Sequence, residues 1–161
     1  MQKKELMIWI WLRIVLGLIF LWAFFDKLFG LGFSTPSDKS WLLGNSPTFG
    51  FLSNAQGIFS VIFKSLAGSI LVDWLFMLGL LLIGVALLFG ITLRLASYLG
   101  ALLMLLMWLA IIPGKTNPIL DDHVVYFIVL LGIAIVKPYL GFGFGRSYYN
   151  NNFIKKYKIL S

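Results

Sequence analysis

Four long apolar stretches place the strongest constraint on what this chain can fold into. They cover Leu6–Phe25, Leu71–Phe89, Leu95–Ile112 and roughly Ile119–Val136. Each stretch is close to the ~20 apolar residues that an α-helix needs to cross a ~30 Å hydrocarbon core. A domain of 161 residues has too small an interior to bury all four. Since helices satisfy their own backbone hydrogen bonds in lipid, we expect an all-α fold, an integral membrane four-helix bundle.

The composition excludes several kinds of cofactor site. The chain is 60% hydrophobic and 12% charged, against about 25% charged residues in soluble domains. It has no cysteine and a single histidine, which removes disulfides, thiolate ligands and any multi-histidine metal site. The glycine-rich run 141–146 lacks a surrounding βαβ unit, so it is not a dinucleotide-binding motif. We therefore expect no metal, haem or nucleotide in this chain.

The distribution of basic residues predicts the orientation in the membrane. One side of a four-span arrangement would hold Lys3, Lys4, Arg94, Lys137, Arg146, Lys155, Lys156 and Lys158, and the other Lys27, Lys39, Lys64 and Lys115. By the positive-inside rule, both termini are expected in the cytoplasm of a multi-pass plasma-membrane protein. The net charge of +7 indicates contact with membrane lipid and no nucleic acid. Since Arg13 interrupts the first stretch, we expect a retained helix and not a cleaved signal peptide.

The whole chain, residues 1–161, is expected to form a single membrane domain. Its helices should cover about 5–29, 71–90, 94–112 and 118–137, with an outer segment at 30–70 and a cytoplasmic tail at 138–161. Asn117 and Pro118 suit the N-cap and the first position of the last helix.

The outer segment carries a helical pattern of its own. Apolar side chains recur there at helical spacing, at Phe51, Ala55, Ile58, Phe59, Ile62, Phe63 and Leu66. Polar residues occupy the opposite face, so we expect an additional amphipathic outer helix on the surface of the bundle. Two roles stay open for it: a cap on the bundle, or a lid over a substrate site.

Ionisable residues gather at the outer ends of three expected helices. They are Asp26, Lys27, Asp73, Lys115, Asp121, Asp122 and His123. Such a mixed cluster at a membrane edge can bind a small anion, or exchange protons with a redox-active ring. The alternative is that these residues are ordinary helix caps and charges that extend to the headgroups.

Helical spacing predicts a polar seam between the first and last helices. Arg13 and Lys27 are fourteen residues apart and share one face, as do His123 and Lys137, with Tyr126 on the same face. Because polar faces of membrane helices turn away from lipid, we expect the two faces to meet. Arg13 either binds a partner at that depth or extends to the inner headgroups. Trp22 belongs to an interfacial aromatic belt or stacks on a quinone ring.

These residues resemble the DoxX family of small four-helix membrane proteins, and look closest to its DoxD branch, the membrane subunit of thiosulfate:quinone oxidoreductase. The matching pieces are Arg13-x-x-x-Gly17-x-x-Phe20 before Asp26-Lys27-Leu28, then Gly90-x-x-x-Arg94-x-Ala96, Asn117-Pro118-x-x-Asp121-Asp122-His123-x-x-Tyr126, and Gly143-x-Gly145-Arg146. The resemblance covers most of the chain except the outer segment and the last residues. One departure is Ser147-Tyr148 after Gly-Arg, where the family often continues with Ser/Gly-Leu-Asp.

The resemblance implies a role in sulfur-oxidising respiration. Proteins similar to this one oxidise thiosulfate to tetrathionate and pass the electrons to membrane quinone, which is the electron acceptor. They work with a second subunit, DoxA, and some associate with terminal quinol oxidase subunits. The alternative function is a non-catalytic accessory subunit of a terminal quinol oxidase or another respiratory complex. A small transporter fits less well, because four helices without an internal repeat suit alternating access poorly.

The catalytic hypothesis assigns roles to residues already identified. His123 with Asp122 would move the proton that quinone reduction requires, and Lys27 would hold the thiosulfate dianion. The residues expected to bind the anion or the quinone are Arg13, Lys27, Arg94, Asp26, Tyr126 and Trp22. We predict that Lys27→Ala and His123→Ala each abolish thiosulfate-dependent quinone reduction.

Overall fold

The computed structural model describes residues 3–114, 117–136, 144–145 and 148, and among these it is all-helical with no strand. The long helices are α1 (Lys3–Phe29), α4 (Ile70–Phe89), α5 (Leu93–Ile111) and α6 (Asp122–Val136). The outer segment holds the short elements η1 (Ser37–Lys39), η2 (Trp41–Leu43), α2 (Phe49–Ser53) and α3 (Ser60–Ser65). The expected tail, 138–161, lies almost wholly outside the described residues, as do Lys115 and Lys137.

Three helices are long and apolar enough to cross a membrane. They are α1, α4 and α5, with mean hydropathies of 2.2, 2.5 and 1.8. The fourth, α6, is apolar but has only 15 residues. Apolar side chains on the outward faces of these helices are exposed, as at Trp11, Leu82 and Ile128. Faces of this kind are consistent with a membrane protein.

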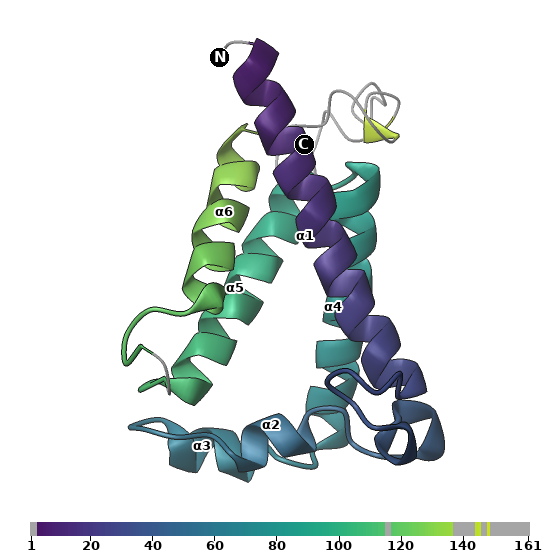
Figure 1. The fold of residues 1–161 in the computed structure, drawn as a ribbon, viewed down its shortest axis with the longest axis vertical. Helices are drawn as coiled ribbons and strands as arrows, with labels where there is room; N and C mark the ends of the chain where they lie inside the picture. Colours follow the sequence, from purple (N-terminus) through teal and green to yellow (C-terminus); the bar gives the residue numbers. More distant parts are fainter. Residues whose placement is uncertain (1–2, 115–116, 137–143, 146–147, 149–161) are drawn as a thin grey trace.

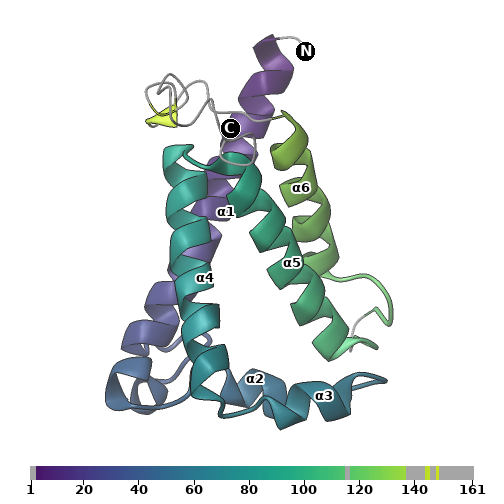
Figure 2. The same ribbon diagram turned by 180° about the vertical axis from the view of Figure 1, so that it is seen from behind.

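The four long helices form two pairs. In Figure 1, α1 lies along α4 and α5 lies along α6, and the pairs diverge toward the end that α2 and α3 occupy. The reverse view in Figure 2 shows the same divergence. Gly17 and Gly84 allow the close contact between α1 and α4, because a Cβ at Gly17 would lie 2.8 Å from the backbone nitrogen of Leu88. Where the pairs converge, a Cβ at Gly132 of α6 would overlap the Trp9 ring of α1.

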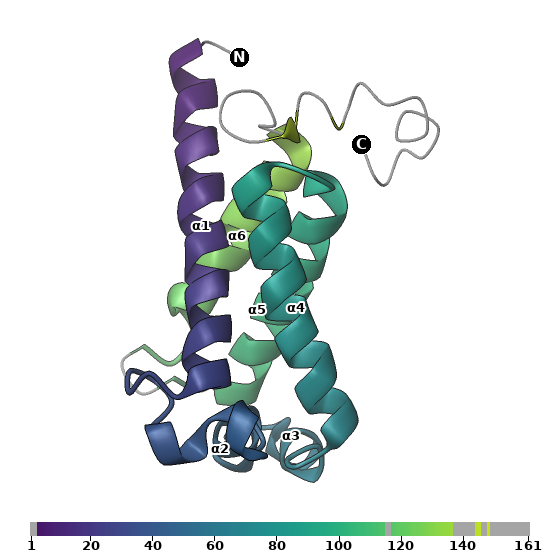
Figure 3. The same cartoon turned by 90° about the vertical axis from the view of Figure 1, so that its right-hand side faces the viewer.

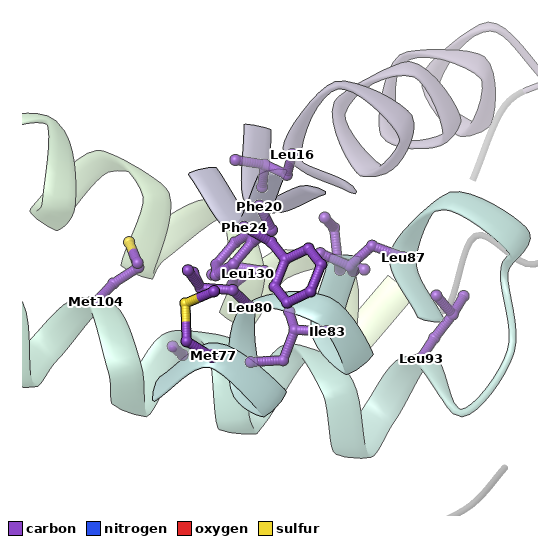
Figure 4. Packing of buried hydrophobic residues seen from close by; sticks show 12 residues of the cluster. Leu16, Phe20, Phe24, Met77, Leu80, Ile83, Leu87, Leu93, Met104 and Leu130 are labelled. Atoms are coloured by element: carbon purple, nitrogen blue, oxygen red, sulfur yellow. The ribbon is translucent and has the colours of Figure 1, made fainter. Parts of the chain in front are cut away.

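One apolar core joins the two pairs. Figure 4 shows Phe20 and Phe24 of α1 with Met77, Leu80 and Ile83 of α4 and Leu130 of α6. The tight turn from α4 to α5 supports this arrangement, since Gly90 (φ 75°) and Thr92 (φ 44°) both adopt the left-handed conformation there. The core therefore holds the pairs together, and their diverging ends are closed by the outer segment.

The expected amphipathic outer helix is two short helices instead of one. Residues 54–59 separate α2 from α3, and Gly57 within them has φ 72°. The Gln56 N–H donates to the Ala110 carbonyl at 2.9 Å, and a Cβ at Gly57 would overlap the Ile112 carbonyl oxygen. The break follows from contact with the end of α5, and the periodic pattern of the sequence does not encode that contact. Figures 1 and 2 show α2 and α3 following one another across the ends of the long helices, and Figure 3 shows the same end of the molecule from the side.

The last helix begins four residues later than its sequence pattern predicts. Asn117 does not cap it; its side-chain oxygen accepts the N–H groups of Ile119 and Leu120, both at 3.0 Å, and forms a turn. Asp121 is the cap instead, because its carboxylate accepts the Val124 N–H at 3.3 Å. Asp122 is then the first helical residue. Both Asn117 and Asp121 are suitable N-cap residues, and Asn117 stabilises the preceding turn while Asp121 caps the helix.

Candidate functional site

A pocket of about 720 Å³ lies where α2, the end of α5 and the start of α6 come together. Its apolar lining comes from Phe51, Ile111, Pro113 and Leu120. The polar residues in its lining are Asn54, Gln56, Asn117, Asp121 and Asp122. The volume suits a small ring-containing molecule, and an apolar wall with a few polar groups is typical of ligand sites.

Asp121 and His123 form the most strongly coupled pair beside this pocket. The Asp121 carboxylate and His123 Nδ1 are 2.7 Å apart, and their side chains are only about one-fifth exposed. Because an ionised carboxylate only accepts hydrogen bonds, this contact requires the proton of the imidazole on Nδ1. Asp121 lines the pocket, while His123 lies behind it and is not among the lining residues.

Asp122 plays a different part from the one its position beside His123 suggested. Its side chain is 70% exposed and its carboxylate lies 3.5 Å from His123 Nδ1, farther than that of Asp121. Ligand atoms of Asp121, Asp122 and His123 lie within 4.8 Å of one another, which is close enough to hold a metal ion. A cluster of this kind on adjacent residues at a helix start is common without a metal, and we assign none.

The loop before α6 is held in place by side chains from both of its ends. The Trp108 indole N–H of α5 donates to the Ile119 carbonyl at 2.8 Å. Asn117 fixes the same loop through the turn described above. Its amide NH₂ group makes no hydrogen bond with any other described residue and remains able to donate to a ligand.

Two other acidic residues, Asp26 and Asp73, are buried and hold the outer segment. Asp26 is 1% exposed and accepts the Phe33 N–H at 3.2 Å, the Ser34 N–H at 3.0 Å and the Ser34 hydroxyl at 2.5 Å. Asp73 is 6% exposed and accepts the Ser46 hydroxyl at 2.8 Å and the Thr48 hydroxyl at 2.5 Å. The carboxylate of Asp26, expected to bind substrate, therefore serves the fold in this structure.

Lys27 and Trp22 lie on the α1–α4 pair, away from the pocket. Lys27 is half-buried, with its ammonium 5.9 Å from the centre of the Phe76 ring on α4. It makes no salt bridge within the described residues. Trp22 is 51% exposed and meets the Phe33 ring edge-on, with ring centroids 5.0 Å apart. An exposed tryptophan near a helix end fits the interfacial belt.

Arg13 and Arg94 lie toward the opposite end of the molecule from the pocket. Arg13 is fully buried, and its guanidinium packs against Gly90 so closely that a Cβ there would overlap it. Arg94 is half-buried in the first turn of α5. Arg13 is thus buried against the turn between α4 and α5 and does not extend to the inner headgroups, which was one of its two expected positions.

The polar seam expected between the first and last long helices does not bring Lys27 and His123 together, and Lys137 of that seam lies outside the described residues. Because α1 packs mainly on α4 and α6 mainly on α5, Lys27 and His123 belong to different helix pairs. Tyr126 lies one turn after His123 but packs against the apolar core. Helical angles predict which residues of one helix share a face, but they carry no information on which neighbouring helix that face meets.

Comparison with family models, with curated proteins and with solved structures found no match to this chain. The resemblance to the DoxD branch therefore stays a prediction based on the residues quoted above.

Sequence reasoning placed Asp121 in the cluster of ionisable residues at the outer helix ends but gave it no individual role, and it assigned no site role to Asn54, Gln56 or Asn117. The sequence signal for Asp121 is that an aspartate directly before an apolar run is a good N-cap, able to accept the N–H three residues later. The amides from α2 carried no such signal, since only the fold of the outer segment brings them to α6.

Proposed function

We propose that the chain is a four-helix membrane protein in which α1, α4, α5 and α6 all cross the bilayer, with both termini in the cytoplasm. The exposed apolar faces of all four helices support this arrangement. The 15 residues of α6 span about 22 Å at 1.5 Å per residue. That is short for a membrane crossing, and a modest local thinning of the bilayer accommodates it.

We further propose that the pocket binds the ring of a membrane quinone, and that the chain is the quinone-reactive subunit of a DoxD-like oxidoreductase. The observation that carries this proposal is the Asp121–His123 hydrogen bond at 2.7 Å, with Asp121 on the pocket wall. Reduction of a quinone takes two electrons and two protons. A carboxylate coupled to an imidazole can supply protons to the quinone oxygens as the electrons arrive.

The rest of the lining suits a neutral ring with two carbonyl groups. The amides of Gln56 and Asn117 can donate to the carbonyl oxygens, while Phe51, Ile111 and Leu120 provide apolar contact for the ring. Of the described residues that line the pocket, two carry a carboxylate and none is a cation. These two carboxylates disfavour a sulfur oxyanion such as thiosulfate, which supports quinone as the occupant.

The electron donor follows from the family resemblance. Two thiosulfate ions, one quinone and two protons give one tetrathionate and one quinol, so charge and electrons balance. We place thiosulfate outside the pocket, at Lys27 or on the DoxA-like partner. Lys27 is the chain's best candidate, because its half-buried ammonium makes no ion pair within the described residues.

The proposal is tested in the complex purified from native membranes or from a host that makes both subunits. Thiosulfate-dependent reduction of decylubiquinone is followed in wild type, Asp121→Asn, and the matched control Asp38→Asn. Asp38 is an exposed carboxylate on η1. We expect Asp121→Asn to lose most of its turnover and Asp38→Asn to match wild type. Equal turnover in all three would refute the role of the pocket.

The same preparation separates the catalytic role from the accessory one. If the chain is an accessory subunit, Asp121→Asn should leave quinone reduction unchanged. The variant would instead weaken assembly, which would be seen as a smaller complex on native gels. If the chain alone binds decylubiquinone in micelles, and Asp121→Asn weakens that binding, the accessory hypothesis fails.

A further inference from the structure

The turn and helix from Gly57 to Leu66, which we call the α3 arm, carry more exposed apolar surface than a protein–water boundary normally tolerates. Ile58 is 92% exposed, Val61 79% and Ile62 61%. Val61 and Ile62 lie on α3, and Ile58 lies in the turn just before it. The arm is not part of the hydrocarbon-spanning helices, because it runs across their ends (Figures 1 and 3).

The α3 arm is followed in the chain by the exposed apolar face of α4. Leu66 is 38% exposed and is followed by Ile70 at 75% and Leu71 at 68%. Trp74, 52% exposed one turn later, marks a depth that indole rings favour at membrane interfaces. Only Ala67, Gly68 and Ser69 separate Leu66 from Ile70, and none of them is charged. The exposed apolar residues of the arm are therefore followed closely in the chain by those of a helix whose outward face meets lipid in the proposed arrangement.

The polar groups of the arm are already satisfied or suit a phospholipid surface. The Ser65 hydroxyl donates to the Ile62 carbonyl at 2.7 Å, so it needs no water. Lys64 is the one charged residue from Phe49 to Leu71, and it is exposed. A single cation among apolar side chains complements the phosphate groups of lipid.

We propose that the α3 arm is immersed in the outer leaflet at the level of the headgroups and upper acyl chains. The inference rests on the proposed membrane arrangement of the four long helices. Gln56, the residue just before the arm, donates its backbone N–H to the Ala110 carbonyl at the end of α5 and lines the pocket. One wall of the pocket therefore adjoins an element that we place in lipid.

The absence of cysteine from the sequence makes the test direct, since each introduced thiol is unique. Ile58→Cys and Val61→Cys are labelled with a nitroxide in the full chain, reconstituted into vesicles of phosphatidylcholine and phosphatidylglycerol. Leu78→Cys, on the exposed face of α4, is the lipid reference, and Asp38→Cys on η1 is the aqueous reference. Collision rates with oxygen and with a water-soluble nickel chelate are measured for each label.

We expect the oxygen-to-nickel ratio at Ile58 and Val61 to exceed that at Asp38 several-fold and to approach that at Leu78. Ratios at Ile58 and Val61 equal to that at Asp38, with Leu78 in lipid, would overturn the inference and leave the four-helix proposal standing. Protection of both labels from both reagents would also overturn it, since a protein surface would then cover the arm. Nickel access at Leu78 would overturn the membrane arrangement itself, and the inference with it.

Discussion

Asp26 and Asp121 are both acidic residues at the outer ends of long helices, and the structure uses them in opposite ways. Asp26 is 1% exposed and accepts three hydrogen bonds from Phe33 and Ser34. Asp121 lines a pocket, and its shortest contact is with a residue that can itself exchange a proton. A carboxylate surrounded by fixed donors stabilises a fold, whereas one beside an imidazole and a cavity is available for chemistry.

The difference extends to the two helix pairs that carry these residues. The α1–α4 pair is bound to the outer segment through Asp26 and Asp73, which accept hydrogen bonds from residues 33–34 and 46–48. Within the part of the chain that the structure describes, the α5–α6 pair meets that segment through the Gln56–Ala110 backbone hydrogen bond and the close approach of Gly57 to Ile112. The pocket lies on the second side, where fewer contacts fill the space between the segment and the helices.

The largest expected effect tests the structural half of this comparison. Asp26→Ala should lower the free energy of unfolding by about 3 kcal/mol, because it removes the buried acceptor of three hydrogen bonds from Phe33 and Ser34. Unfolding is measured by denaturant titration in micelles, with Asp38→Ala as the exposed control. A loss no greater than that of the control would mean that Asp26 does not hold the outer segment.

The next effect tests the chemical half. Asp121→Asn should lower kcat for quinone reduction by about 100-fold, in the range that a positioned acid–base group contributes. Asparagine caps a helix as well as aspartate, so the free energy of unfolding should change by less than about 0.5 kcal/mol. If Asp121→Asn greatly lowered the free energy of unfolding and left turnover normal, Asp121 would have the structural role that we assign to Asp26.

Lys27 sharpens the comparison because it lies on the side without the pocket. Lys27→Gln should raise KM for thiosulfate about tenfold, as expected for loss of a charge-assisted contact, and leave KM for quinone unchanged. Steady-state kinetics with each substrate varied in turn give both constants. A rise in the quinone KM instead would show that the two helix pairs share one site.

Trp108 tests whether the loop before α6 positions Asp121. Trp108→Phe removes the indole N–H that donates to Ile119 and keeps an aromatic ring. We expect a loss of about 1 kcal/mol in unfolding free energy and a rise in the quinone KM with kcat little changed. An equal fall in kcat would place Trp108 in the chemistry and not in positioning.

The smallest expected effect concerns Gln56, whose side-chain amide we propose as a hydrogen-bond donor to the quinone. Gln56→Ala should raise KM for quinone about threefold, the value of one neutral hydrogen bond. The Gln56 backbone bond to Ala110 is unaffected by this change, so the α3 arm stays attached. Asn45→Ala, outside the pocket, is the matched control, and a similar effect there would remove Gln56 from the site.

Sequence patterns predicted the long helices well, because each depends on a local run of apolar residues. The first helix was expected over about 5–29 and is found at Lys3–Phe29, and the turn at Gly90 was placed correctly. Patterns failed where contacts between distant segments decide. The break between α2 and α3 follows from the approach of Gly57 to Ile112, which no local pattern encodes.

The candidate site was only partly predictable for the same reason. His123 stood out because it is the single histidine in apolar sequence, and it does lie beside the pocket wall. Lys27 stood out equally, yet it lies on the other helix pair, since pairing depends on small residues such as Gly17 and Gly84 and not on charge.

The most direct test of the account is to find where a quinone binds. A photoreactive azidoquinone is crosslinked to the complex in native membranes, and the labelled peptides are identified by mass spectrometry with and without excess unlabelled quinone. We predict competed labelling within residues 50–56 and 111–122. Competed labelling confined to the α1–α4 pair, around Arg13 or Lys27, would contradict the claim that this pocket is the quinone site.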